Sequence, residues 1–124
     1  MSYHVLIVED DSALRQLYCL YLARGQYEYT AVASAQEALD ALSMLAIDVI
    51  IADVNLGEEI NGLELIDMIR RNEAYDHIKI ITLTSFPERY DINDPIRINL
   101  SLNKPVDYKR LMESLHRLLN DDLT

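Results

Sequence analysis

The strongest constraint on the fold is a series of short apolar runs separated by segments with helical periodicity. Val5–Val8 and Val49–Ala52 are rich in β-branched residues and each is followed by an acidic residue, a pattern typical of strands buried on both faces of a parallel sheet. Lys79–Thr84 has a similar character. Strands that alternate with helices imply parallel strands joined by right-handed crossovers. The sequence therefore predicts a three-layer α/β fold with helices on both faces of the sheet.

Four segments carry apolar residues at helical spacing, and the first three also have a recognisable boundary signal. The first helix begins at Asp11 or Ser12 and ends at Gly25, the second begins with the capping box Ser34–Glu37, the third follows Gly62, and the last contains the apolar stripe from Leu111 to Leu119.

The stretch from Ser85 to Asn99 departs from this alternation. Pro87 and Pro95 leave room for at most a short helix between them, so we expect the fourth helix of the fold to be short or irregular. From Ile96 to Leu102 apolar and polar residues alternate, which predicts a strand with one buried face and one wetter face at an edge of the sheet.

Length and composition fit one compact domain. Half of the 124 residues are hydrophobic and 26% are charged, which is typical of a globular chain rather than a disordered one. The 21 acidic residues exceed the 11 Lys and Arg, for a net charge of −10, and this charge disfavours nucleic acids and anionic membranes as partners. The N-terminal residues contain no export signal or membrane span, so the expected location is the cytoplasm.

Polar side chains gather at the predicted carboxyl ends of the strands, where open parallel sheets bind ligands. Glu9 and Asp10 follow the first strand, Asp53 follows Val49–Ala52, Thr84 ends the Lys79–Thr84 strand, and Lys104 follows the last one. Two carboxylates about 5 Å apart repel by roughly 3 kcal/mol at an effective dielectric constant near 20, so a cation must compensate them. Mg²⁺ suits such a set of oxygen ligands.

These residues also have the composition of a phosphoryl-transfer site. A carboxylate such as Asp53 can act as a nucleophile toward phosphorus and form an aspartyl phosphate. Lys104 supplies a mobile positive charge for Asp53 or for a phosphoryl oxygen, and Thr84 adds a hydroxyl donor. Asp11, the third acidic residue in its run, fits a helix cap or a solvated side chain better than a metal ligand.

Five motifs make the chain resemble the receiver domains of two-component response regulators over essentially its whole length. In order, they are Val5–Asp11, Asp48–Asp53, the helix start Gly62–Leu65, Ile80–Ser85 and Asn103–Pro105. The resemblance implies a flavodoxin-like fold whose five parallel strands follow the order 2-1-3-4-5, with residues 1–124 forming a single receiver domain.

The resemblance further implies roles for individual residues. Asp53 would accept a phosphoryl group from a histidine kinase or a histidine phosphotransfer protein, and Thr84 and Lys104 would contact the phosphoryl oxygens. The ligands of Mg²⁺ would be Glu9, Asp10, Asp53 and the backbone carbonyl of Asn55.

A domain of this kind is a signalling switch that would remove its own phosphoryl group, not an enzyme that turns over small molecules. Its output would pass through contacts with an unknown downstream protein, at the face formed by the fourth helix, the fifth strand and the fifth helix. The same face could support a homodimer.

Two departures from the family pattern leave a second function open. Ser101 stands three residues before Lys104, where the family usually has an aromatic switch residue, and prolines interrupt the fourth-helix segment. The alternative is a receiver-like interaction module that works without phosphorylation. A Mg²⁺-dependent phosphohydrolase is disfavoured, because Asn55 rather than a second aspartate stands two residues after Asp53.

Overall fold

The computed structural model describes residues 3–54, 61–85 and 97–120. Strands and helices alternate along the chain, as the sequence predicts. The elements are β1 (His4–Val8), α1 (Ser12–Arg24), β2 (Glu28–Val32), α2 (Ala35–Met44), β3 (Val49–Asp53), α3 (Gly62–Arg70), the 3₁₀ helix η1 (Glu73–Tyr75), β4 (Lys79–Thr84), β5 (Leu100–Asn103) and α4 (Tyr108–Asn120).

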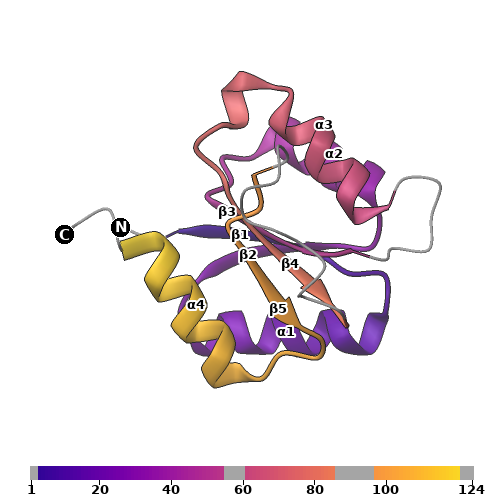
Figure 1. Cartoon of the computed structure of the whole chain (residues 1–124). Helices are drawn as coiled ribbons and strands as arrows, with labels where there is room; N and C mark the ends of the chain where they lie inside the picture. The colour runs from indigo at the N-terminus through magenta and orange to yellow at the C-terminus, as the bar shows by residue number, and fades with distance from the viewer. Residues whose placement is uncertain (1–2, 55–60, 86–96, 121–124) are drawn as a thin grey trace.

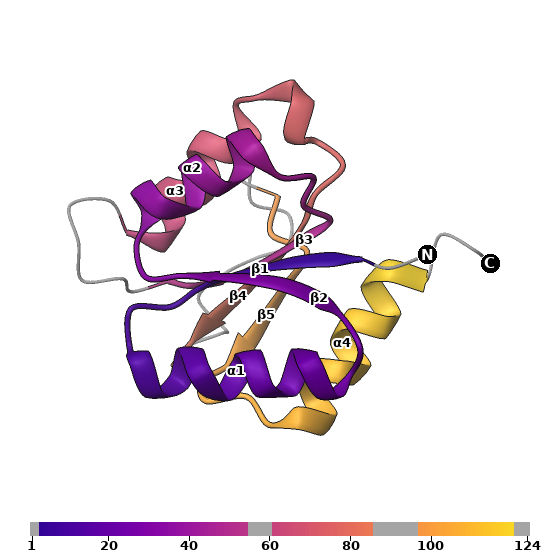
Figure 2. The same cartoon turned by 180° about the vertical axis from the view of Figure 1, so that it is seen from behind.

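The five strands form one parallel sheet in the order β2-β1-β3-β4-β5, which confirms the predicted flavodoxin-like topology. Helices α2 and α3 cover one face of the sheet, and α1 and α4 cover the other (Figure 1). The view from behind shows the same three layers (Figure 2). Because all strands are parallel, the loops that follow their carboxyl ends meet at one edge of the sheet.

The central strands are buried because each face of the sheet has its own hydrophobic core. Leu6 and Val8 of β1 pack toward α2 and α3, whereas Val5 and Ile7 pack toward α1 and α4. The side chains alternate because successive residues of a strand point to opposite faces. Strand β2 is different: its residues are half-buried or exposed, since it lies at an edge of the sheet.

Local side-chain contacts explain where the first two helices begin. The Asp11 carboxylate accepts hydrogen bonds from the backbone N–H groups of Ala13 and Leu14, at 2.9 and 3.0 Å, so Asp11 rather than Ser12 caps α1. Ser34 caps α2 through the N–H of Glu37, at 3.2 Å. The Glu37 carboxylate accepts a hydrogen bond from the backbone N–H of Ala33. In the standard capping box this donor is the N–H of the cap residue itself, one residue later.

The last strand is shorter than the sequence alternation predicts. A bend at Asn99 precedes β5, which begins at Leu100. Since the bend interrupts the two-residue period, Ile98 packs with the α2–α3 core while Leu102 packs with the α1–α4 core. The prediction of one shared buried face is therefore wrong for Ile98, and Ile96 lies outside the described residues.

Two further points concern the limits of the elements. The expected short or irregular fourth helix, between Pro87 and Pro95, falls in a segment outside the described residues. Among the helices that the structure does describe, none has the length and apolar character needed to cross a membrane.

Gly62 begins α3 at a point of close backbone contact. A Cβ atom at this position would collide with the carbonyl oxygen of Asp53 and lie 2.8 Å from the Cα of Val54. We therefore expect Gly62→Ala to lower the free energy of unfolding by about 1–3 kcal/mol, although alanine has the better helix propensity by about 1 kcal/mol. Urea denaturation of both proteins measures this difference.

Gly25→Ala provides the matched control. Its added Cβ would meet the sulfur of Met112, the outer part of a flexible side chain that can move aside. The loss of stability should therefore be clearly smaller at position 25 than at position 62. Equal losses for the two variants would contradict the role assigned to the backbone contact of Gly62.

Candidate functional site

The predicted polar residues meet at the carboxyl edge of the sheet. Glu9 directly follows β1, Asp53 ends β3, Thr84 ends β4 and Lys104 directly follows β5. The Glu9 side chain is fully buried, and Asp53 and Thr84 are 2% and 6% exposed. The order of the strands places β1 and β3 side by side, with β4 and β5 next to them, so residues distant in the sequence share one small region.

Lys104 links the two buried acids. Its Nζ atom lies 2.5 Å from Asp53 Oδ2 and 3.3 Å from Glu9 Oε1. The backbone fixes the lysine as well, because the N–H of Lys104 donates to the carbonyl of Thr84 at 3.0 Å. The peptide bond that follows, Lys104–Pro105, is cis. The ammonium group thus sits between the two carboxylates.

Burial changes the protonation of Glu9. It disfavours the charged form and raises the pKa of Glu9 from 4.5 to about 7. The N–H of Asp11, which donates to Glu9 Oε2 at 3.2 Å, opposes this rise. The charge of Asp53 adds to the rise and that of Lys104 reduces it. Burial therefore outweighs the stabilisation that Lys104 and the N–H of Asp11 give to the charged form of Glu9.

The same surroundings favour the charged form of Lys104. Its partial burial alone lowers the pKa of the ammonium group, but the hydrogen bond to Asp53 and the charges of Asp53 and Glu9 outweigh burial, so the pKa is raised overall. Lys104 consequently keeps its positive charge at neutral pH. It supplies a positive charge within an acidic cluster.

Asp10 completes a set of three carboxylates suited to a metal ion. One oxygen each from Glu9, Asp10 and Asp53 lie within 4.8 Å of one another. When all three acids are ionised, they and Lys104 together carry a charge of −2. Oxygen ligands in a site of this charge match Mg²⁺, which binds through one or two carboxylates and retains several waters.

A buried oxygen supports this match. Within the part of the chain that the structure describes, Glu9 Oε1 accepts no hydrogen bond of good geometry, although Lys104 Nζ is 3.3 Å away. A buried carboxylate oxygen without a hydrogen bond is unfavourable, and a bound cation would satisfy it. The fourth predicted ligand, the carbonyl of Asn55, lies outside the described residues.

Ser101, at the position where an aromatic residue is usual, bonds to a neighbouring strand instead. Its hydroxyl lies 2.7 Å from the Thr82 hydroxyl, and Thr82 is fully buried. The two residues face each other in the register of β4 and β5. Thr84, two residues beyond Thr82, pairs with Asn103 in the same register. Hydroxyl groups thus connect β5 to β4 beside the site.

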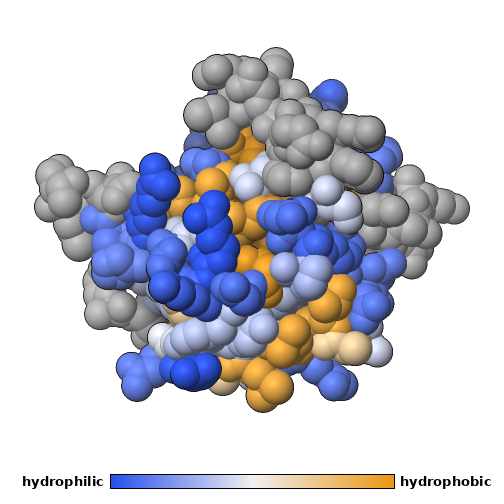
Figure 3. All heavy atoms as spheres, turned by 60° about the horizontal axis from the view of Figure 1, so that its bottom comes forward, coloured by the Kyte–Doolittle hydropathy of each residue, from blue (hydrophilic) through white to orange (hydrophobic). Residues whose placement is uncertain are grey.

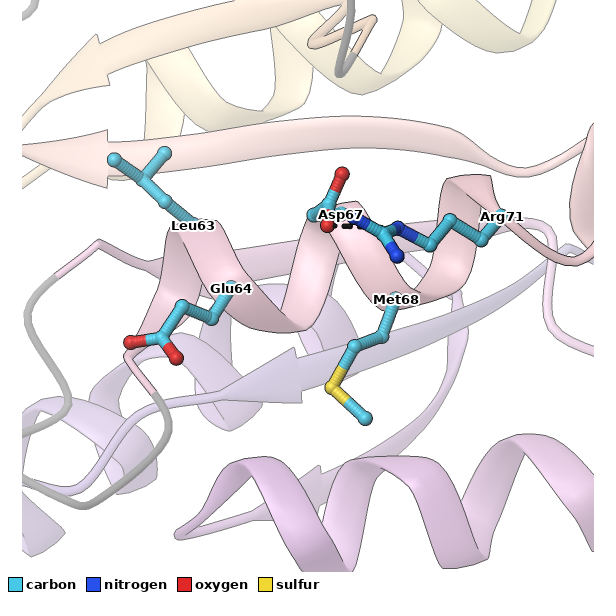
Figure 4. A pocket seen from close by; sticks show the side chains of 5 residues that line it. All are labelled: Leu63, Glu64, Asp67, Met68 and Arg71. Atoms are coloured by element: carbon cyan, nitrogen blue, oxygen red, sulfur yellow. Dashed lines mark ion pairs between the residues drawn. The ribbon is translucent and has the colours of Figure 1, made fainter.

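A hollow on the outer surface of α3 is separate from the acidic cluster. Figure 4 shows its lining, which comes from α3 and from Arg71, the residue that follows it: Leu63, Glu64, Asp67, Met68 and Arg71. The Asp67–Arg71 ion pair there, at 3.0 Å, is largely exposed, and such surface pairs contribute little stability. None of the clustered carboxylates lines this hollow.

Comparison with known proteins identifies the family to which this arrangement belongs. Residues 5–116 match the response regulator receiver domain. The polar-differentiation response regulator DivK of Brucella ovis is 30% identical over 124 residues, covering 98% of this chain and 99% of DivK. The regulatory protein VirG of Agrobacterium tumefaciens is 40% identical over 81 residues, which is 65% of this chain but 29% of VirG. The chain thus spans less than a third of VirG and nearly all of DivK.

Solved structures agree with this family. Chemotaxis response regulator CheY4 of Vibrio cholerae has a TM-score of 0.86 at 28% identity, with 95% of this chain and 99% of CheY4 covered. The receiver domain of sensor histidine kinase PA1611 from Pseudomonas aeruginosa, solved with a magnesium ion in its active site cleft, has a TM-score of 0.82 at 25% identity, with 94% and 97% covered.

Receiver domains are signalling domains rather than enzymes that turn over small molecules; they bind Mg²⁺ at an acidic pocket and interact with histidine kinases or phosphotransfer proteins. The fold, the acidic edge of the sheet and the family match over residues 5–116 lead to one conclusion. The chain belongs to the response regulator receiver domain family of two-component signal transduction.

Proposed function

We propose that the chain is a phosphoryl-accepting switch whose acceptor is Asp53 and whose phosphodonor is a phosphohistidine on a kinase or phosphotransfer protein. The observation that carries this proposal is the position of Asp53. Asp53 is the last residue of β3 and is 2% exposed. Its carboxylate lies within reach of both Lys104 and two further carboxylates. Because histidine kinases use ATP, the proposal also assigns the chain to the cytoplasm.

The proposed reaction forms one bond and breaks another. A carboxylate oxygen of Asp53 attacks the phosphorus of the phosphohistidine, and the O–P bond forms as the P–N bond breaks. The electron pair of the P–N bond leaves with the imidazole nitrogen, which takes a proton from solvent. Attack of water on the aspartyl phosphate later releases inorganic phosphate and restores the carboxylate, so the switch resets itself.

The surrounding residues favour this transfer electrostatically. Lys104, which now neutralises Asp53 at 2.5 Å, is placed to move its charge to a phosphoryl oxygen, and Thr84 would donate its hydroxyl to another. Glu9, Asp10, Asp53 and the Asn55 carbonyl would hold Mg²⁺. When bound, Mg²⁺ neutralises the negative charge of the phosphoryl group and of the acids around it.

Output is proposed to pass through the side of the domain formed by β5 and α4. Helix α4 is the last helix of the chain and corresponds to the fifth helix of the predicted output face. There, the structure shows a hollow lined by Leu100, Arg110, Glu113, Ser114 and Arg117. Figure 3 brings α1 and α4 forward and shows apolar surface broken up by hydrophilic side chains, a mixture that suits transient protein contacts. A downstream protein or a second copy of the chain would bind here.

The acceptor is tested by intact-mass measurement after incubation with Mg²⁺ and acetyl phosphate. We expect the wild type to gain the mass of one phosphoryl group, in an adduct that is stable in acid and labile in base. Asp53→Asn should gain none, because the amide is not a nucleophile toward phosphorus.

Asp11→Asn is the matched control for the loss of one acid near the site. Asp11 caps α1 and asparagine caps helices equally well, so this variant should still be phosphorylated. If the wild type forms no adduct with saturating donor, the chain is instead the interaction module that works without phosphorylation, an alternative to which the Ser101–Thr82 contact lends support.

Mg²⁺ binding should depend on pH through Glu9. Since the pKa of Glu9 is raised to about 7, the metal must displace a proton below that pH. The apparent dissociation constant for Mg²⁺ should therefore fall by about tenfold per pH unit as the pH rises toward 7, and level off above it. Calorimetric titrations between about pH 5.5 and about pH 8.5 measure this dependence.

Glu9→Gln separates Glu9 from other titrating groups. The variant should bind Mg²⁺ more weakly above pH 7 but lose most of the pH dependence, because glutamine does not titrate. A slope that persists unchanged in Glu9→Gln would show that another group is responsible for it.

A further inference from the structure

A residue outside the acidic cluster holds the loop that carries two of the three carboxylates. The loop runs from the end of β1 into α1 (Figure 2). Arg15 reaches back over it from α1, and its Nη1 atom lies 2.9 Å from the carbonyl oxygen of Glu9 and 3.4 Å from that of Asp10. One guanidinium nitrogen thus contacts the backbone of both acidic residues.

The position of Arg15 in the helix is electrostatically unfavourable by itself. It is the fourth residue of α1, which begins at Ser12, and a positive charge near a helix N-terminus is repelled by the helix dipole. Side chains in a helix point back toward the N-terminus, so an arginine here can reach the preceding loop. Hydrogen bonds from a charged donor to two carbonyls offset the repulsion.

The rest of the loop secures Glu9 more firmly than Asp10. The N–H of Glu9 donates to the carbonyl of Val32 at 3.1 Å, its carboxylate accepts from the N–H of Asp11 at 3.2 Å, and its side chain is fully buried. Asp10 is exposed, so burial does not hold it. The contact of Arg15 with the Asp10 carbonyl therefore matters most for the direction of the Asp10 carboxylate.

We propose that Arg15 is a positioning residue for Mg²⁺: it fixes the Glu9–Asp10 backbone so that both carboxylates converge with that of Asp53. The inference rests on the proposed function of this site. Arg15 binds no ligand itself; it acts through the two carbonyls.

Two effects of Arg15 on Mg²⁺ have opposite signs, which makes the inference testable. The positive charge of Arg15 repels a divalent cation, so removing that charge alone would tighten binding. Removing the hydrogen bonds would loosen the loop and weaken binding. If positioning dominates, the charge-removing variant Arg15→Gln binds Mg²⁺ less tightly than the wild type.

The experiment measures Mg²⁺ dissociation constants by calorimetry above pH 7, where a proton on Glu9 no longer competes. Arg15→Gln should raise the dissociation constant by about tenfold, the usual effect of losing a residue that orients metal ligands. Arg15→Lys keeps the charge but loses the forked donor and should show an intermediate increase. Unchanged or tighter binding in Arg15→Gln would overturn the inference.

Arg24→Gln is the matched control. Arg24 is the last residue of the same helix and lies over the ring of Tyr108, at 4.2 Å from its centroid. Its replacement removes the same charge from α1 without touching the loop, and it should leave the affinity for Mg²⁺ nearly unchanged. A weakening equal to that of Arg15→Gln would show that the effect does not depend on the contacts of Arg15 with the loop, and would overturn the inference.

Phosphorylation by acetyl phosphate distinguishes positioning from general damage to the fold. In Arg15→Gln, the Mg²⁺ concentration for the half-maximal rate should rise by the same factor as the dissociation constant, while the rate at saturating Mg²⁺ stays near that of the wild type. A lower rate at saturation would point to general damage and overturn the inference. If thermal denaturation of Arg15→Gln shows no unfolding transition, the variant is not folded, and the Mg²⁺ affinity of Arg15→Lys decides the outcome.

The two proposals fail in different ways. If the wild type binds Mg²⁺ and is phosphorylated but the Arg15 variants match it, the positioning role alone is wrong. If the wild type binds no Mg²⁺ and takes up no phosphoryl group, the proposed function is wrong and the role of Arg15 falls with it.

Discussion

The ion pair between Lys104 and Asp53, at 2.5 Å, is the interaction on which the site depends. Without a cation, two buried acids from neighbouring strands would repel each other at the centre of the sheet edge. Lys104 only partly compensates them, and burial, with a smaller contribution from the charge of Asp53, raises the pKa of Glu9. The fold therefore tolerates an excess of negative charge at one edge, a destabilising feature typical of functional sites.

The topology explains how Lys104 reaches two acids that lie 51 and 95 positions earlier in the sequence. Parallel strands bring all carboxyl ends to one edge, and the order β2-β1-β3-β4-β5 puts the strands that carry the two buried acids side by side. Two hydrophobic cores hold the strands rigid from both faces. Small features then set the loops: Gly62 lets α3 approach the backbone of β3 closely, and Asp11 and Arg15 fix the loop before α1.

Much of the fold, and the gathering of polar residues at the carboxyl ends of the strands, can be predicted from the sequence, because both depend on local patterns. Buried runs such as Val5–Val8 predict central strands, and acids at their ends predict a shared site when the strands are parallel. Strand β2 was not predicted from its own residues, because an edge strand with exposed positions lacks a continuous apolar run. The position of Ile98 was also missed, since a bend at Asn99 leaves no clear signal in an alternating segment.

The role of Arg15 cannot be predicted from the sequence, for a different reason. Its partners are backbone carbonyls. Every residue has a carbonyl, so the residue types in the sequence do not indicate this contact. A signal nevertheless existed: a cation in the first turns of a helix that follows an acidic run stands against the helix dipole, and such a conflict usually indicates a specific partner.

The charge imbalance also couples binding to conformation. A ligand that binds the folded site but not the unfolded chain stabilises the fold, and here a bound cation would remove repulsion among acids from the end of β1, the loop after it and β3. A phosphoryl group on Asp53 would restore negative charge at the same point and compete for Lys104, whose backbone is bonded to Thr84 at 3.0 Å. Movement of Lys104 would thus pull on β4 and β5 together, since the Thr82 and Ser101 hydroxyls join these strands beside the site. In this chain a polar contact between Thr82 and Ser101, rather than an aromatic side chain, joins β4 to β5 beside the site.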